Sequence, residues 1–117
     1  DACRAALDAG VNIAIHSDAP VTPLGPLFTA WCAVNRLTMS GRTLGGAQRI
    51  SVDEALRLYT MNGAYASFEE DTKGSIEIGK LADLVVLGSD PTQIDPLGIK
   101  DIQVERTIVG GKTVYGV

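Results

Sequence analysis

The chain has 117 residues, of which 45% are hydrophobic and 21% are charged, and its formal net charge is −4. This composition is that of one small globular unit with a core of its own, and it argues against a disordered chain. Lysine and arginine form no cluster, so we expect no nucleic-acid partner. The longest apolar run, Leu84–Leu87, is much shorter than the roughly 20 residues that cross a membrane, so we expect no membrane partner either.

The first residues predict an α/β rhythm. Alanines at helical spacing over residues 1–9 indicate the end of a helix, and Gly10 is placed to stop it. Residues 11–16 predict a short buried strand with its alternate apolar residues on one face. Residues 17–26 contain three prolines and predict a loop. A helix, a glycine, a strand and a polar turn in this order are typical of parallel α/β proteins.

Further helices follow. Residues 27–39 carry an apolar stripe at helical spacing, and residues 40–50 contain three glycines and predict an exposed loop. Ser51 and Glu54 then have the spacing of a capping box, in which each side chain satisfies a backbone N–H at the start of a helix. Residues 60–67 are small and polar, and we expect them to be helical or turn-like.

The last part of the chain predicts antiparallel β-structure. Residues 75–78 alternate in character, and residues 82–87 form a run rich in strand-forming side chains. Two further strands, 104–109 and 112–115, flank the pair Gly110-Gly111. Two glycines between strands predict a hairpin, because both accept a positive φ.

The chain therefore divides into two parts by character. We predict that residues 1–67 form an α/β part and that residues 68–117 form a small antiparallel β part. The junction falls near residues 69–74, which are charged and end in a glycine, as is typical of a boundary.

Cys3 and Cys32 are the two cysteines of the chain. They are too few for a disulfide framework and too far apart for a CxxC metal site. We expect two buried or half-buried thiols in a reducing compartment, which favours a cytoplasmic location.

Asp18 is the main candidate for chemistry, because it lies just past the carboxyl end of the predicted strand 11–16. In parallel α/β barrels the active site is built from the loops at that end of the strands. A carboxylate there can bind a divalent metal and take a proton from a metal-activated water. A structural role as a helix N-cap or in an Asx turn is the competing interpretation.

His16 is the only histidine, and Ser17 stands between it and Asp18. Residues two apart share a face of an extended strand, so His16 and Asp18 can point into one pocket, where His16 would contact substrate or support the site. The alternative is a strand-end histidine bonded to a backbone carbonyl. One histidine and one aspartate do not make a complete metal site, since a catalytic zinc usually has three protein ligands. Ser17 lacks the G-x-S-x-G setting of a hydrolase nucleophile.

Several motifs together carry a family resemblance. Residues 8–115 resemble the C-terminal part of amidohydrolase-superfamily metal hydrolases, on the YtcJ-like, N-substituted formamide deformylase-like branch. The matching pieces are His16-Ser17-Asp18-Ala19-Pro20, Ser51-Val52-Asp53-Glu54-Ala55-Leu56, Thr60-Met61-Asn62-Gly63-Ala64, Gly74-Ser75-Ile76-Glu77-Ile78-Gly79-Lys80-Leu81-Ala82-Asp83-Leu84-Val85-Val86-Leu87 and Val109-Gly110-Gly111-Lys112-Thr113-Val114-Tyr115.

The resemblance implies a fold and a site. It implies that residues 11–16 are the eighth strand of a (β/α)8 barrel and that the strands after residue 68 belong to a β-sandwich remote from the chemistry. Asp18 would be the strand-eight aspartate that holds a divalent metal, with zinc the one expected, or its water, and that carries a proton to the leaving nitrogen. His16 and Ser17 would contact the substrate or support Asp18.

The resemblance also implies that much of the active site lies outside this sequence. The His-x-His pair of strand one, the bridging ligand of strand four and the histidines of strands five and six are absent, and a full barrel takes roughly 250 residues. We therefore expect a parent enzyme that hydrolyses an amide or related non-peptide C–N bond of a small molecule. The chain alone is expected to be inactive and to hold no metal tightly.

Two further expectations concern assembly. A strand that normally pairs on both sides exposes unpaired edges when its neighbours are missing, so we expect a homo-oligomer. The alternative function is a non-catalytic binding or assembly module derived from an amidohydrolase tail.

Overall fold

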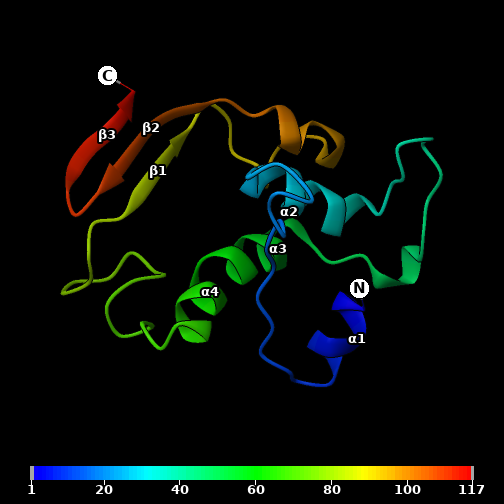
Figure 1. The fold of residues 1–117 in the computed structure, drawn as a ribbon, viewed down its shortest axis with the longest axis horizontal. Helices are drawn as coiled ribbons and strands as arrows, with labels where there is room; N and C mark the ends of the chain where they lie inside the picture. Colours follow the sequence, from blue (N-terminus) through cyan, green and yellow to red (C-terminus); the bar gives the residue numbers. More distant parts are fainter. Residues whose placement is uncertain (1, 117) are drawn as a thin grey trace.

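The computed structural model describes residues 2–116, with the helices on one side of a small antiparallel sheet (Figure 1). Among these residues every helix is too short or too polar to cross a bilayer. The elements in chain order are α1 (Cys3–Asp8), α2 (Pro26–Asn35), the 3₁₀ helix η1 (Gly46–Gln48), α3 (Val52–Tyr59), α4 (Met61–Ala66), β1 (Leu84–Leu87), the 3₁₀ helix η2 (Pro96–Asp101), β2 (Val104–Val109) and β3 (Lys112–Gly116).

The first two helices end through left-handed backbone. After α1, Gly10 has φ +70° and its N–H donates to the carbonyl of Leu7, which confirms the predicted stop. Helix α2 begins with Pro26 at its first position, where a missing N–H costs nothing. It ends at Asn35 because Arg36 adopts φ +56°, so the predicted helix over residues 27–39 was too long at its carboxyl end.

The predicted strand 11–16 is not a strand in the structure, although its alternation is present. Ile13 and Ile15 are half-buried and pack against the core, whereas Ala14 and His16 are exposed. A strand is defined by its ladder, and residues 2–116 place no other strand beside this segment. The prediction of a strand was therefore wrong, and the predicted alternation holds from Ile13 onward but not at Val11, which is exposed.

Residues 75–78 were also predicted to be strand-like, and the structure shows a loop. The half-buried ammonium group of Lys80 donates to the carbonyl oxygens of Glu70 and Lys73 and to Oγ of Ser75. Three acceptors around one cation draw this stretch into a compact turn, so it cannot extend along the sheet.

The capping box at the start of α3 is present as predicted. Oγ of Ser51 accepts from the N–H of Glu54 at 3.1 Å, and the N–H of Ser51 donates to Oε2 of Glu54 at 2.7 Å. The second carboxylate oxygen of Glu54 accepts from Nη1 of Arg4 at 2.7 Å. One carboxylate therefore caps α3 and also ties α1 to it.

The sheet is antiparallel, with strand order β1-β2-β3. Gly110 and Gly111 have φ +54° and +78°, so the predicted Gly-Gly hairpin between β2 and β3 is confirmed. The N–H of Gly110 also donates to Oδ1 of Asp83 at 2.7 Å, which fixes the hairpin to the residue preceding β1.

The core lies among α2, α3 and η2. Ile99 of η2 and Leu58 of α3 are the largest fully buried side chains, and Ala30 of α2 lies in the same cluster. Nε1 of Trp31 donates to the carbonyl of Leu97 at 2.9 Å, which ties η2 to α2. The division of the chain at residues 67 and 68 remains a prediction.

Replacing the buried Ile99 measures how much η2 contributes to this core. Ile99→Ala should lower the free energy of unfolding by about 2–5 kcal/mol, because it removes buried methyl groups and leaves a cavity. Ile78→Ala is the matched control: Ile78 is fully exposed, and the change should stay within about 0.5 kcal/mol. Urea denaturation followed by circular dichroism measures both, and equal losses would contradict the assigned core.

Glu54 gives the chain a defined acid sensitivity. The backbone N–H of Ser51, and then the Arg4 guanidinium, lower the pKa of Glu54 below its ordinary value of 4.5. Because the folded-state pKa is the lower one, the carboxylate stabilises the fold above about pH 4.5, and this contribution is lost as the pH falls through the lowered pKa. Glu54→Gln should therefore be less stable near pH 7 and lose less stability between about pH 6 and pH 3 than the unmodified chain. Urea denaturation at about pH 6 and about pH 3 measures the free energy of unfolding of both proteins. An equal loss of stability between these two pH values in Glu54→Gln and in the unmodified chain would refute the prediction.

Candidate functional site

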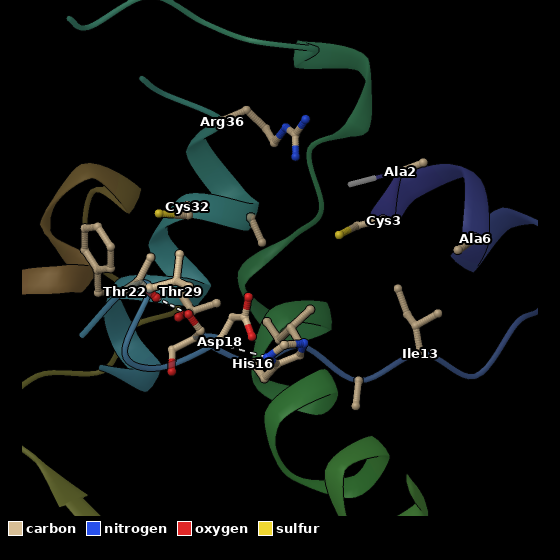
Figure 2. A pocket seen from close by; sticks show the side chains of 16 residues that line it. Ala2, Cys3, Ala6, Ile13, His16, Asp18, Thr22, Thr29, Cys32 and Arg36 are labelled. Atoms are coloured by element: carbon tan, nitrogen blue, oxygen red, sulfur yellow. Dashed lines mark hydrogen bonds between the residues drawn. The ribbon is translucent and has the colours of Figure 1, made fainter. Parts of the chain in front are cut away.

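An open cavity of about 730 Å³ lies between α1, the segment over residues 13–18 and α2 (Figure 2). His16, Ser17 and Asp18 all line it, so the structure brings the three sequence candidates together. On the far side, Phe28, Thr29 and Cys32 of α2 contribute to the wall. His16 and Asp18 therefore line one cavity, and their roles there stay predictions.

Asp18 occupies a left-handed backbone conformation with φ +53°. Its side chain is exposed, and its carbonyl accepts from the N–H of Val21 at 2.8 Å, which closes a turn. The N-cap of the next helix is Gly25, and within residues 2–116 the Asp18 carboxylate accepts no hydrogen bond. The two structural roles considered for Asp18, N-cap and Asx turn, are therefore not the ones the structure shows.

His16 is held by the backbone of Asp18. The N–H of Asp18 donates to Nδ1 of His16 at 3.0 Å, so Nδ1 is an acceptor and the neutral ring carries its proton on Nε2 (Figure 2). The alternative interpretation of His16 was a hydrogen bond from its ring to a backbone carbonyl. The structure shows a hydrogen bond from a backbone N–H to the ring instead. A ring in this tautomer offers a donor to whatever occupies the cavity.

Ser17 is half-buried between these two residues. Its carbonyl accepts from Oγ1 of Thr22, and this contact closes the loop that follows Asp18 (Figure 2). Together with the turn from Asp18 to Val21, it fixes the backbone of the loop on both sides of the carboxylate.

The cavity wall also contains residues that the sequence analysis did not assign to a site. Burial raises the pKa of the Cys32 thiol, which keeps it protonated and makes it a poor nucleophile. Arg36 lies at the rim, where its Nε donates to the carbonyl of Leu44 at 3.1 Å. Arg36 ends α2 by adopting a left-handed backbone conformation, and hydrophobic periodicity in the sequence does not predict this conformation.

Asn62 was quoted in a family motif but given no role. It is a buried residue of α4, and its Nδ2 donates to the carbonyl oxygen of Ile13 at 2.8 Å. Its partner lies 49 residues away in sequence, so no local pattern predicts the contact.

The residues present fit part of a metal site. Among residues 2–116 no three histidine, cysteine, aspartate or glutamate side chains lie close enough to hold a metal ion together. The unpartnered Asp18 carboxylate is a suitable oxygen ligand for a divalent ion. Asp18 therefore suits the role of one oxygen ligand, and the described residues do not complete a metal site around it.

Comparison with known proteins gives the family. The sequence pattern of the amidohydrolase family matches residues 1–115. An N-substituted formamide deformylase from Arthrobacter pascens is 43% identical over 96% of this chain and 21% of its own length. A putative amidohydrolase, YtcJ, from Bacillus subtilis (strain 168) is 32% identical over 97% of this chain and 22% of its own length.

Solved structures agree. An amidohydrolase from Thermotoga maritima MSB8 superposes with a TM-score of 0.67 at 32% identity, over 95% of this chain and 24% of that one. E. coli guanine deaminase superposes with a TM-score of 0.70 at 26% identity, over 97% of this chain and 30% of that one. The chain thus spans about a fifth of the length of the two curated relatives, and its fold is that of a C-terminal portion of an α/β amidohydrolase. It belongs to the amidohydrolase family.

Proposed function

We propose that this chain supplies one part of the active site of a metal-dependent amidohydrolase that cleaves a non-peptide C–N bond in a small molecule. The observation that carries the proposal is the exposed carboxylate of Asp18, which accepts no hydrogen bond within residues 2–116, at a cavity it shares with His16. Family membership supports the same chemistry. The relative at 43% identity is named for its action on N-substituted formamides, which makes an N-substituted amide the substrate class we propose.

Asp18 has two roles in this proposal. It is one ligand of a divalent metal, zinc in our proposal, with the other ligands supplied by residues outside this chain. When bound, such a metal polarises the substrate carbonyl and makes water more acidic. Asp18 accepts a proton from the attacking water while the water oxygen bonds to the carbonyl carbon. Asp18 then delivers that proton to the leaving nitrogen as the C–N bond breaks.

His16 and Ser17 are proposed to assist Asp18. The Nε2–H of His16 donates to a substrate oxygen, because Nδ1 is already occupied by the Asp18 N–H. Ser17 holds the turn through its carbonyl and lines the cavity. With one candidate ligand in place, the isolated chain is expected to be inactive and to hold no metal tightly.

A chimeric protein tests the role of Asp18. The matched 112 residues of the Arthrobacter pascens deformylase are replaced by this chain, and bound metal and release of formate from an N-substituted formamide are measured. Asp18→Asn should lower turnover by roughly 10²–10⁴-fold, since the carboxamide cannot carry the proton. It should also weaken metal retention on dialysis, as measured by plasma mass spectrometry.

The matched control is Asp71→Asn, the same change at an exposed carboxylate outside the cavity. It should leave turnover and metal content unchanged. An Asp18→Asn chimera with full activity would refute the proposed role and favour the alternative of a binding or assembly module. Stoichiometric metal in the isolated chain would refute the divided site.

We also propose that the isolated chain self-associates into a homo-oligomer. Residues 11–16 are extended in character without a neighbouring strand among residues 2–116, and apolar side chains such as Val11, Val21 and Leu24 are exposed nearby. Light scattering coupled to gel filtration should give at least twice the 12.3 kDa mass of one chain. A monomer at micromolar concentration would contradict the proposal.

A further inference from the structure

We infer that Asn62 is a positioning residue that sets the register of the segment carrying His16 and Asp18. The inference rests on the proposed function only in giving Asp18 a catalytic task. That the buried Asn62 amide on α4 holds this segment in place is argued from contacts within the chain alone.

The segment has few other ties to the body of the molecule. At its start the N–H of Val11 donates to the carbonyl of Ala6, and at its end the loop closes on itself through Thr22 and Val21. Between these points, in the part of the chain that the structure describes, the hydrogen bond from Asn62 to the Ile13 carbonyl is the one that comes from another element. Figure 1 shows the segment passing beside the α3–α4 region.

The position of this bond matters because side chains alternate along an extended segment. Ile13 and Ile15 are half-buried and pack against the core, whereas His16 and Asp18 are exposed, and all four residues line the cavity. A slip of one residue would exchange the exposed and half-buried positions and shift the carboxylate from its place at the cavity. A hydrogen bond to a single carbonyl, that of Ile13, excludes such a slip because it holds in one register only.

Burial makes the contact hard to replace. Asn62 is 9% exposed, so its amide has little access to water, and loss of the pair leaves the Ile13 carbonyl without its protein donor. Asn35 provides a matched comparison. It is 8% exposed, and its Nδ2 donates to the carbonyls of Trp31 and Pro96, so it holds η2 rather than the Asp18 segment.

The first test uses this chain without metal or substrate. Backbone ¹⁵N order parameters are measured for Asn62→Ala, for Asn62→Leu, which keeps the branched side-chain shape and removes the donor, and for Asn35→Ala. Both Asn62 variants should lower the order parameters of residues 12–18 from about 0.85 to below about 0.6 and leave β2 and β3 unchanged. Asn35→Ala should loosen residues 96–101 instead. Order parameters of residues 12–18 that stay unchanged in both Asn62 variants would overturn the inference.

The second test uses the chimeric deformylase and connects Asn62 to Asp18. Asn62→Ala should lower kcat by roughly 10- to 100-fold with little change in KM, because it misplaces the carboxylate rather than removing a binding contact. In the Asp18→Asn background the same change should have no further effect. An equal loss of kcat in both backgrounds would overturn the inference. If Asp18→Asn instead leaves turnover unchanged, the proposed function is refuted, and the order parameters alone then test the role of Asn62.

The chimera also covers the case in which the Asn62 variants unfold the isolated chain. Hydrogen exchange of the peptide over residues 11–21, read by mass spectrometry, should then be roughly three- to tenfold faster in Asn62→Ala than in Asn35→Ala. Equal exchange in the two variants would count against the inference.

Discussion

The backbone of residues 11–18 imposes the central constraint on this molecule, because its peptide groups have few hydrogen-bond partners among the described residues. The described residues place no strand beside the segment, so its alignment depends on Ile13 and Ile15 packing inward and on Asn62 bonding one carbonyl. His16 and Asp18 line the cavity at the end of this segment. Apolar side chains beside this segment, such as Val11 and Val21, are exposed.

The helical part acts as the platform for this segment. Helices α2 and α3 enclose a core completed by Ile99 of η2, and Trp31 and Asn35 tie η2 to α2 through backbone carbonyls. Glu54 adds α1 to the same body through Arg4. The sheet of β1, β2 and β3 contributes no residue to the cavity, so its packing affects the candidate site only through the polypeptide that joins them.

Signals that act over a few residues were predictable from sequence. The Ser51–Glu54 capping box and the Gly110-Gly111 hairpin are complete within four residues each, and the structure contains both. The strand over residues 11–16 was predicted wrongly because a strand needs a neighbouring strand, and residues 2–116 place none beside this segment. Asp18 could be selected from its place after an alternating segment, whereas the role of Asn62 depends on a contact across 49 residues.

The hydrogen bond between Asp18 and His16 makes the two side chains chemically complementary. It occupies Nδ1, so the imidazole presents a donor at Nε2, while the neighbouring carboxylate is unpartnered in the described chain and presents acceptors. Hydrolysis of an amide needs both on one face: a donor for the carbonyl oxygen and an acceptor for the proton of water. A surface used only for assembly requires neither group to be exposed at a cavity. The pairing is therefore a stronger argument for descent from a catalytic site than either residue is alone.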